Sequence, residues 1–418
     1  MRLTTSPWGP VPSRLRTLLF NPFGAATAAT VAIWATGLFS ESALVDAATL
    51  KSPVGAGLDL PLGYLLFAPW FALVDHMSLL SVPQHLSIVC FALLSIALVG
   101  ALKRDSKWAL VTSLGFLIVL GVIVTVGTLV PRPMARIRVS VPADNVVVDF
   151  HSHTNASHDG RKGFSLAANQ MWHARSGFDV AYVTDHGEGQ PFAAGRTGLA
   201  GGASTIMLRG GEFVWRGRHV IGLGAPMNTR ALIQTLPGAV TGDSALRPGP
   251  DTMIVATELV DGAPRGLAQG ERERADIFAV RDRWALAFVG SSNQHGWGFT
   301  SPVWSVAAVP NWRSLAYPEL DHRLQQLLTG GGKDVRVLAR RRTAEASTML
   351  GLALTPVNFA VTMIRTLSPA ERVSWTAWVG GIALLATLLG RPQSTTADAR
   401  KRVPLDFGDL KPAYEPAA

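Results

Sequence analysis

The stretch VVVDFHSHTNASHDG (146–160) decides how this chain is interpreted. Its first five residues form a β-rich apolar run that is typical of a buried strand. Side chains two positions apart in an extended chain face the same side, so His151 and His153 can point at one metal ion. The turn that follows adds His158 and Asp159. The stretch therefore predicts a strand that ends in a metal-binding site.

The same arrangement recurs along the chain after this stretch. DVAYVTDHG (179–187) ends with Asp185 and His186. GGEF (210–213) adds Glu212, His219 begins the following strand, and NQH (293–295) ends a late strand. Six of the ten histidines lie in these motifs. A single His-x-His would be weak evidence, but its repetition at successive strand ends predicts a divalent metal centre. Imidazoles with carboxylates suit Mn, Zn or Fe without distinguishing among them.

Residues 145–335 alternate short β-rich runs with helical stretches such as 165–176. This alternation predicts an α/β domain with a parallel sheet or barrel. In such folds the carboxyl ends of the strands build the active site. We therefore expect the motif residues to meet at one end of the sheet.

Composition places this domain in a membrane protein. The chain has 418 residues, 48% hydrophobic and 16% charged, whereas soluble domains carry about 25% charged residues. These values exclude a disordered chain and an ordinary soluble enzyme, and the single cysteine excludes a disulfide framework. Six apolar stretches are predicted to span the bilayer, of which the second is the weakest: 19–40, 60–78, 84–102, 108–130, 346–364 and 373–390.

The expected organisation follows from these stretches. An N-terminal membrane region (1–131) with about four helices leads through a linker (132–144) to the metal-binding domain (145–335). A C-terminal membrane region (336–390) with one or two helices precedes a polar tail (391–418), expected to be disordered. We expect an integral membrane protein, of the inner membrane if the chain is bacterial.

Charge bears on the partners and on the side of the membrane. The net charge is +9, but residues 132–335 carry only +2, which argues against a nucleic-acid partner. With six spans, fourteen flanking Lys and Arg share the domain's side and six lie opposite, which predicts a cytoplasmic domain. If 60–78 does not span, the domain lies on the exterior.

The motifs together resemble the PHP domain, which is named for its occurrence in DNA polymerases and histidinol phosphatases. The resemblance covers about 146–300, and five motifs in matching order carry it: DFHSHTNASHDG (149–160), GFDVAYVTDHG (177–187), GGEF (210–213), RHVIGLG (218–224) and GSSNQH (290–295). It implies a distorted (β/α)7 TIM-like barrel with two or three divalent ions that hydrolyses phosphoesters.

The resemblance also implies roles for individual residues. Glu212 would bridge two ions and, with His186 and Arg161, carry catalysis, while Asp185 would lie behind the ligands. Asp159 or His158 would take the acidic position of the first motif, because this chain has one residue more than the family there. The other implied ligands are His151, His153, His219, Asn293 and His295. The phosphate-binding residues expected from charge are Arg161, Lys162, Arg209, Arg216 and Arg218.

Two departures from the family pattern keep alternatives open. Asn293 stands where the family has Asp, and no histidine lies between His219 and His295, although Glu258 is a substitute for it. Two ions are therefore expected more firmly than three. The leading hypothesis is a membrane-tethered phosphoesterase acting on a phosphorylated small molecule or lipid head group. The alternatives are a metal- or ligand-binding sensor with a decayed site and a nuclease acting on short oligonucleotides.

Overall fold

A computed structural model describes residues 21–140, 144–186, 205–215, 218–224, 228–236 and 254–389. The chain forms two compact units. One comprises Met1–Val31 with Ala377–Ala418, and the other comprises Ala32–Thr376. The second unit contains the sheet and all the residues of the site.

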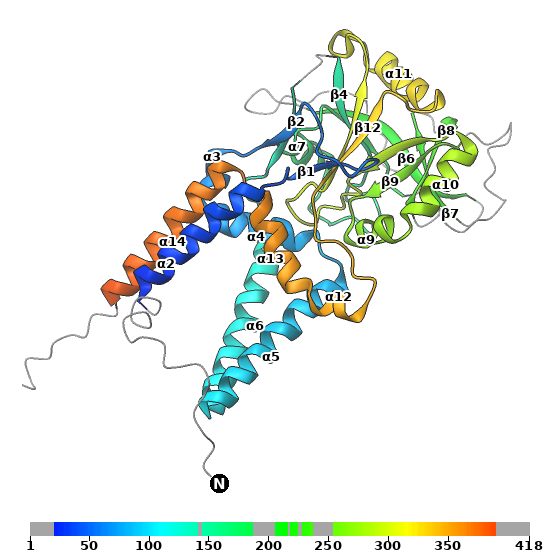
Figure 1. Cartoon of the computed structure of the whole chain (residues 1–418). Helices are drawn as coiled ribbons and strands as arrows, with labels where there is room; N and C mark the ends of the chain where they lie inside the picture. Colours follow the sequence, from blue (N-terminus) through cyan, green and yellow to red (C-terminus); the bar gives the residue numbers. More distant parts are fainter. Residues whose placement is uncertain are drawn as a thin grey trace, which may run out of the picture. The chain divides into compact units, whose positions relative to one another are not determined.

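The sheet of the second unit has ten strands in the order β1-β12-β11-β4-β5-β6-β7-β8-β9-β10, and β2 pairs separately with β3 (Figure 1). The strands are β1 (Leu44–Asp46), β2 (Ala56–Asp59), β3 (Arg136–Val139), β4 (Asn145–Ser152), β5 (Val180–Val183), β6 (Ile206–Trp215), β7 (Arg218–Leu223), β8 (Asn228–Gln234), β9 (Ile254–Asp261), β10 (Ala287–Ser291), β11 (Val303–Ala308) and β12 (Val335–Arg340).

This sheet corrects the expected fold, because a (β/α)7 TIM-like barrel is wrong for this chain. The sheet is mixed and curled into a half-barrel. Four neighbouring pairs are parallel (β4–β5, β5–β6, β8–β9 and β9–β10), and the others are antiparallel. Strands β6, β7 and β8 follow one another as antiparallel neighbours, which a barrel of alternating strands and helices does not allow.

The curl of the sheet brings the exits of β4 and β10 together. Ser152 and Gln294 form an isolated parallel bridge, and the Asn293 N–H donates to the His151 carbonyl oxygen at 2.8 Å. Apolar side chains of β4, β5, β6 and β7 to β10 share one buried core, which includes Phe150 and Tyr182. Burial of this core stabilises the curl, and the polar strand ends converge at one rim as a result.

The sheet extends beyond the expected domain boundaries of 145 and 335. Strand β12 continues to Arg340, and β1, which lies between the first two expected spans, pairs with it in antiparallel register. Leu44 of β1 is fully buried in the apolar cluster that also holds Leu338 and Trp304. The segment before the membrane hairpin is therefore part of the domain.

The helices include four that are long and apolar enough to cross a membrane, among the residues that the structure describes. These are α2 (Pro22–Ala35) extended by the 3₁₀ turn η1 (Thr36–Phe39), α5 (Val82–Lys103), α6 (Ser106–Leu129) and α14 (Pro369–Leu389). The remaining helices are α3 (Leu62–Leu66), α4 (Ala68–Ser78), α7 (Leu166–Ser176), α9 (Pro264–Arg272), α10 (Arg274–Trp284), the 3₁₀ turn η3 (Trp312–Ser314), α11 (Tyr317–Thr329), α12 (Met349–Ala353) and α13 (Thr355–Thr366).

Two of the six expected spans are divided into short helices. The stretch 60–78 becomes α3 and α4, and 346–364 becomes α12 and the greater part of α13. Pro69 and Pro356 lie in the first turns of α4 and α13, where proline starts a helix but cannot continue the preceding one. Neither stretch provides the roughly 20 helical residues that a bilayer requires.

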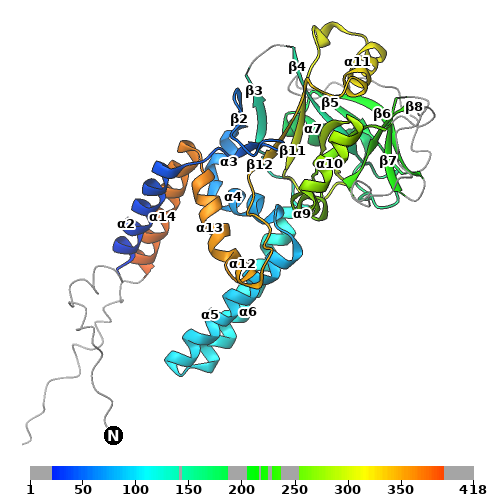
Figure 2. The same ribbon diagram turned by 45° about the vertical axis from the view of Figure 1, so that its right-hand side comes forward.

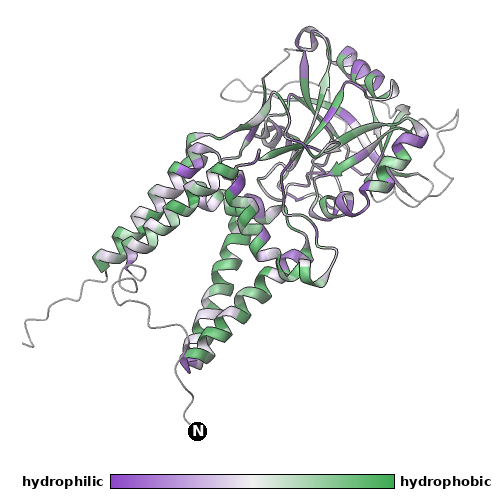
Figure 3. Cartoon of the chain, viewed as in Figure 1, coloured by the Kyte–Doolittle hydropathy of each residue, from purple (hydrophilic) through white to green (hydrophobic). Residues whose placement is uncertain are grey.

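Helices α5 and α6 lie side by side and lead away from the sheet within the second unit (Figures 1 and 2). Both are apolar over most of their surface (Figure 3). They leave large side chains such as Leu94 and Ile118 exposed. A helix that is apolar on every side and not buried in protein is suited to lipid.

Candidate metal centre

Glu212 lies at the centre of the site. Its Oε2 is 3.0 Å from His151 Nε2, 3.2 Å from His153 Nε2 and 3.4 Å from His186 Nε2, and its Oε1 is 2.8 Å from His219 Nδ1. The two histidines of β4 come within reach because they face the same side of that strand. His151 Nε2 and His153 Nε2 are only 2.9 Å apart. Four imidazoles therefore surround one buried carboxylate.

The ligand atoms fall into three groups, each compact enough to hold one ion. The structure thus confirms the coarser prediction that His, Asp and Glu cluster as a divalent metal would require. Glu212 belongs to two of the groups, His153 to two and His186 to two. The groups are His151–His153–Glu212, His186–Glu212–His219, and His153–Asp159–His186–His295.

Of His158 and Asp159, the turn after β4 places Asp159 in a candidate ligand group. Asp159 Oδ2 is 3.1 Å from His295 Nε2 and 3.5 Å from His186 Nε2. The Ser157 hydroxyl donates to Asp159 Oδ1 at 2.8 Å and holds the carboxylate in place. Both His158 and Asp159 are exposed, but His158 belongs to none of the groups, and its ring is tilted against that of His186 with centroids 4.8 Å apart.

Glu258 lies behind the ligands rather than among them. It is fully buried, and its Oε1 accepts from His151 Nδ1 at 3.0 Å while its Oε2 accepts from the Leu236 N–H at 3.1 Å. Ser291 also donates to Oε1. A carboxylate on one ring nitrogen fixes the tautomer and leaves the other nitrogen free to ligate. Glu258 thus directs His151 Nε2 toward Glu212.

A second support, which the sequence analysis missed, involves Asp149 of β4 and His173 of α7. His173 lies outside the sequence motifs, but it is fully buried and its Nε2 is 2.7 Å from Asp149 Oδ2. Asp149 also accepts from the N–H and the hydroxyl of Ser292. The pair ties α7 and the exit of β10 to the strand that carries both β4 histidines. One indication was present in the sequence: Asp149 lies two residues before His151, so the two side chains face the same side of the strand.

Asn293 is placed so that its carbonyl oxygen is available. Its Nδ2 donates to Asp261 Oδ2 at 3.1 Å, and its Oδ1 is buried with no hydrogen-bond partner among the described residues. A buried acceptor without a partner costs free energy, which a bound cation would recover. The orphaned oxygen, together with the imidazole and carboxylate donors, fits a divalent ion at this rim.

The electrostatics of the cluster reflect this crowding. Burial acts against the charged form of His151, but Glu212 and then Glu258 raise its pKa well above the ordinary value. Burial and the neighbouring His151 and His295 lower the pKa of His153 to about 3. Burial favours a protonated Glu212, but His151 and His153 hold its pKa far below the ordinary value. Without a metal ion the site therefore combines a charged Glu212 and a charged His151 with a neutral His153, and ligation by His151 requires the loss of its proton.

Asp185 stabilises the turn after β4. It is buried, and its two oxygens accept from the Thr154 N–H at 2.6 Å and from the Thr154 hydroxyl at 2.7 Å. That Asp185 lies behind the ligands stays a prediction. The next residue, His186, forms an isolated parallel β-bridge with Glu212.

The expected phosphate-binding residues are only partly described. Arg161 lies next to the cluster, since its N–H donates to the His295 carbonyl oxygen at 2.9 Å and its guanidinium is 5.7 Å from the Trp297 ring centroid. Lys162 is exposed and Arg209 is half-buried on β6. Arg216 and the side chain of Arg218 lie outside the described residues.

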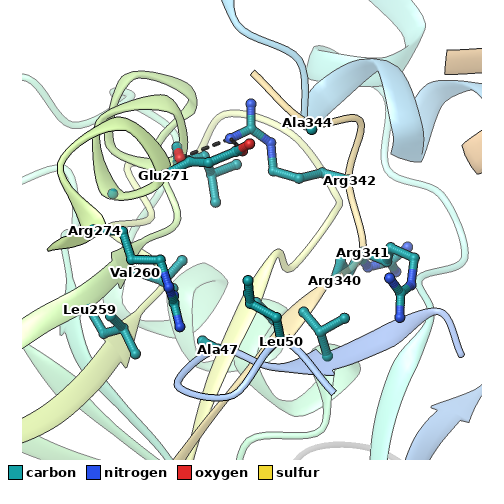
Figure 4. Close-up of a pocket in the computed structure, with 14 residues that line it drawn as sticks. Ala47, Leu50, Leu259, Val260, Glu271, Arg274, Arg340, Arg341, Arg342 and Ala344 are labelled. Atoms are coloured by element: carbon teal, nitrogen blue, oxygen red, sulfur yellow. Dashed lines mark hydrogen bonds and ion pairs between the residues drawn. The ribbon is translucent and has the colours of Figure 1, made fainter. Parts of the chain in front are cut away.

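A separate cavity of about 260 Å³ lies between β1, β9, α9 and the segment after β12 (Figure 4). Its lining is mainly apolar, with arginines at the rim that already have partners. Arg342 pairs with Glu271 at 3.1 Å, and Arg274 donates to the Ala48 carbonyl oxygen at 2.6 Å. The cavity shares no residue with the three ligand groups, so it is distinct from the Glu212 cluster.

Comparison with known proteins adds little to this geometry. No family model matches the chain, and no curated protein matches it. One solved structure that is similar to part of it is PsfC from Pseudomonas syringae PB-5123, at 15% identity and a TM-score of 0.29. The similarity covers 52% of this chain and 96% of that one.

Proposed function

We propose that this chain is a membrane-bound, metal-dependent phosphoesterase. The observation that carries the proposal is the position of Glu212, whose two oxygens serve two adjacent ligand groups. A carboxylate shared in this way suits a pair of divalent ions. Such a pair, when bound, supplies an activated water and neutralises the oxygens of a phosphate ester. The PHP-like order of the motifs supports the same reaction class.

The chain's own residues supply the remaining functions. Glu258 and the Asp149–His173 pair hold the β4 histidines in fixed orientations. Arg161, beside His295, offers a planar fork of donors for the non-bridging oxygens of a phosphate. His186 links two ligand groups, so its loss would affect both.

We further propose that the domain lies on the exterior side of the membrane. Pairing of β1 with β12 requires the segment between α2 and α5 to share the domain's side. With four spans, both termini and the α5–α6 turn then lie opposite the domain. Within 20 residues of a span end, ten Lys and Arg lie on that opposite side and six lie on the domain's side. The rule that positive flanks stay inside makes the opposite side cytoplasmic.

The test of the activity uses the full-length protein purified in detergent. We expect bound Mn²⁺ or Zn²⁺ at two or more equivalents and hydrolysis of p-nitrophenyl phosphate or bis-p-nitrophenyl phosphate. His186→Ala should abolish the hydrolysis, while His322→Ala, on the exposed face of α11, should not change it. One tightly bound ion without turnover of either ester would favour the sensor hypothesis. Retained turnover in His186→Ala would refute the assigned site.

A further inference from the structure

We infer that the phosphate ester hydrolysed at this site is carried by a membrane lipid. The inference rests on the proposed phosphoesterase function and concerns its substrate class. It follows from the depth at which the structure holds the ligand His295 relative to the spanning helix α6. Three features of the structure support it: the hydrogen bond between Gly298 and Thr128, the ion network around Asp75, and the exposed side chain of Trp297.

The loop after β10 is bonded directly to the end of α6. The Gly298 N–H donates to the Thr128 carbonyl oxygen at 3.1 Å, in the last turn of that helix. Helix α6 has 24 residues and is about 36 Å long at 1.5 Å per residue, somewhat longer than a hydrocarbon core of about 30 Å. Its last turn therefore lies at the depth of the lipid head groups.

The metal centre is consequently close to that depth as well. His295 precedes Gly298 by three residues, a separation of at most about 10 Å even in an extended chain. Trp172 donates through Nε1 to the Gly298 carbonyl oxygen at 3.2 Å, so the loop is also fixed to α7. A lipid phosphate in the head-group layer is within reach of this ligand without leaving the bilayer.

A buried ion network fixes the same loop to α4. Asp75 pairs with Arg132 at 2.5 Å and with Arg340 at 2.9 Å, and all three side chains are buried. The Thr300 hydroxyl donates to Asp75 at 2.7 Å, and Arg340 Nε donates to the Ser301 carbonyl oxygen at 3.0 Å. The loop therefore has two independent attachments to the helical part, at Gly298 and at Thr300.

Helix α4 in turn packs on the last turn of α6. A Cβ on Gly127 would lie 2.6 Å from Val74 Cγ1, so the two helices are in close contact one residue before Thr128. Around this contact α3 and α4 expose Leu66, Phe67 and Trp70. Exposed aromatic and aliphatic side chains at the end of a spanning helix are suited to the membrane interface.

The rim of the site presents a further interfacial side chain. Trp297 is 55% exposed, and the Arg161 guanidinium lies 5.7 Å from its ring centroid. Tryptophan with a neighbouring cation is the combination that head-group layers favour, because the ring is amphipathic and the lipid phosphate is anionic. Arg161 can therefore contact a phosphate that is attached to a lipid and lies beside the metal ligands.

The experiment compares lipid and soluble esters with the full-length protein in lipid nanodiscs containing Mn²⁺. The lipid substrates are phosphatidic acid and phosphatidylglycerol, and the matched soluble esters are glycerol 3-phosphate and glycerophosphoglycerol. We expect kcat/KM to be at least tenfold higher for a lipid than for its soluble counterpart. The lipid rate should also fall when a non-substrate lipid dilutes the bilayer at constant total substrate.

Two variants and one control substrate separate the outcomes. Trp297→Ala should lower the ratio of lipid to p-nitrophenyl phosphate turnover at least threefold, whereas Trp34→Ala, an exposed tryptophan of α2, should leave that ratio unchanged. An equal change of this turnover ratio in Trp297→Ala and Trp34→Ala would overturn the inference. So would turnover of p-nitrophenyl phosphate and the soluble esters with none of the lipids, although the proposed function would then stand. No turnover of any ester would overturn both.

Discussion

Replacing Glu258 by glutamine tests whether this residue orients His151 or binds a metal ion itself. The sequence left Glu258 as a substitute for a missing histidine ligand, whereas the structure places it behind His151 at 3.0 Å from Nδ1. A glutamine side chain has one carbonyl oxygen, which can accept a hydrogen bond from His151 or from the Leu236 N–H but not from both. It also lacks the negative charge that raises the basicity of the His151 imidazole. The expected effect is therefore on affinity and not on the number of ions.

The magnitude follows from comparable supports behind metal-bound histidines, whose loss lowers metal affinity about 10–100-fold. That range corresponds to about 1.4–2.7 kcal/mol of binding free energy. The upper part of the range is expected, because Glu258 is fully buried and Ser291 and Leu236 would have to adapt to the amide. Global stability should change little when metal is bound.

The assay is competition of the full-length protein with a chelator for Mn²⁺ or Zn²⁺, together with the metal content of the saturated protein. Glu319→Gln, an exposed carboxylate paired with Arg323 on α11, is the control and should bind as the wild type does. Wild-type affinity in Glu258→Gln would refute the orienting role. Loss of one whole equivalent with the others unaffected would show that Glu258 is a ligand after all.

Three further predictions concern other parts of the site and its attachment. His186→Ala should remove at least one equivalent of metal, because His186 serves two ligand groups, and metal analysis checks this. Burial, and then Glu258, raise the pKa of Asp261 from 3.8 to about 7, so its contribution to the stability of the metal-free protein is greatest below about pH 4 and is lost as the pH rises through about 7. Chemical unfolding across that range should show a shallower decline in Asp261→Asn, and an identical decline would contradict the shift. Asp75→Ala leaves Arg132 and Arg340 buried without their partner, which should cost about 3–5 kcal/mol of unfolding free energy; a loss below about 1 kcal/mol would contradict the buried network.

Local patterns in the sequence were sufficient to predict much of the metal centre. His151 and His153 face one side because an extended chain repeats every two residues, and that relation needs no knowledge of the rest of the fold. The apolar runs of α5 and α6 are likewise recognisable as candidate membrane spans from their length and composition. Both kinds of prediction depend only on neighbours along the chain.

The tertiary structure alone decided the direction of the strands, the role of Glu258 and the choice of Asp159 over His158. Strand direction depends on which strands pair, and β1 pairs with β12 although nearly 300 residues separate them. Glu258 could be placed behind His151 only when β9 and β4 had been positioned by the curl of the sheet. Hydropathy alone also does not show that 60–78 and 346–364 are divided into short helices, because Pro69 and Pro356 start new helices inside apolar stretches. These features arise from long-range packing and backbone breaks, which no local repeat encodes.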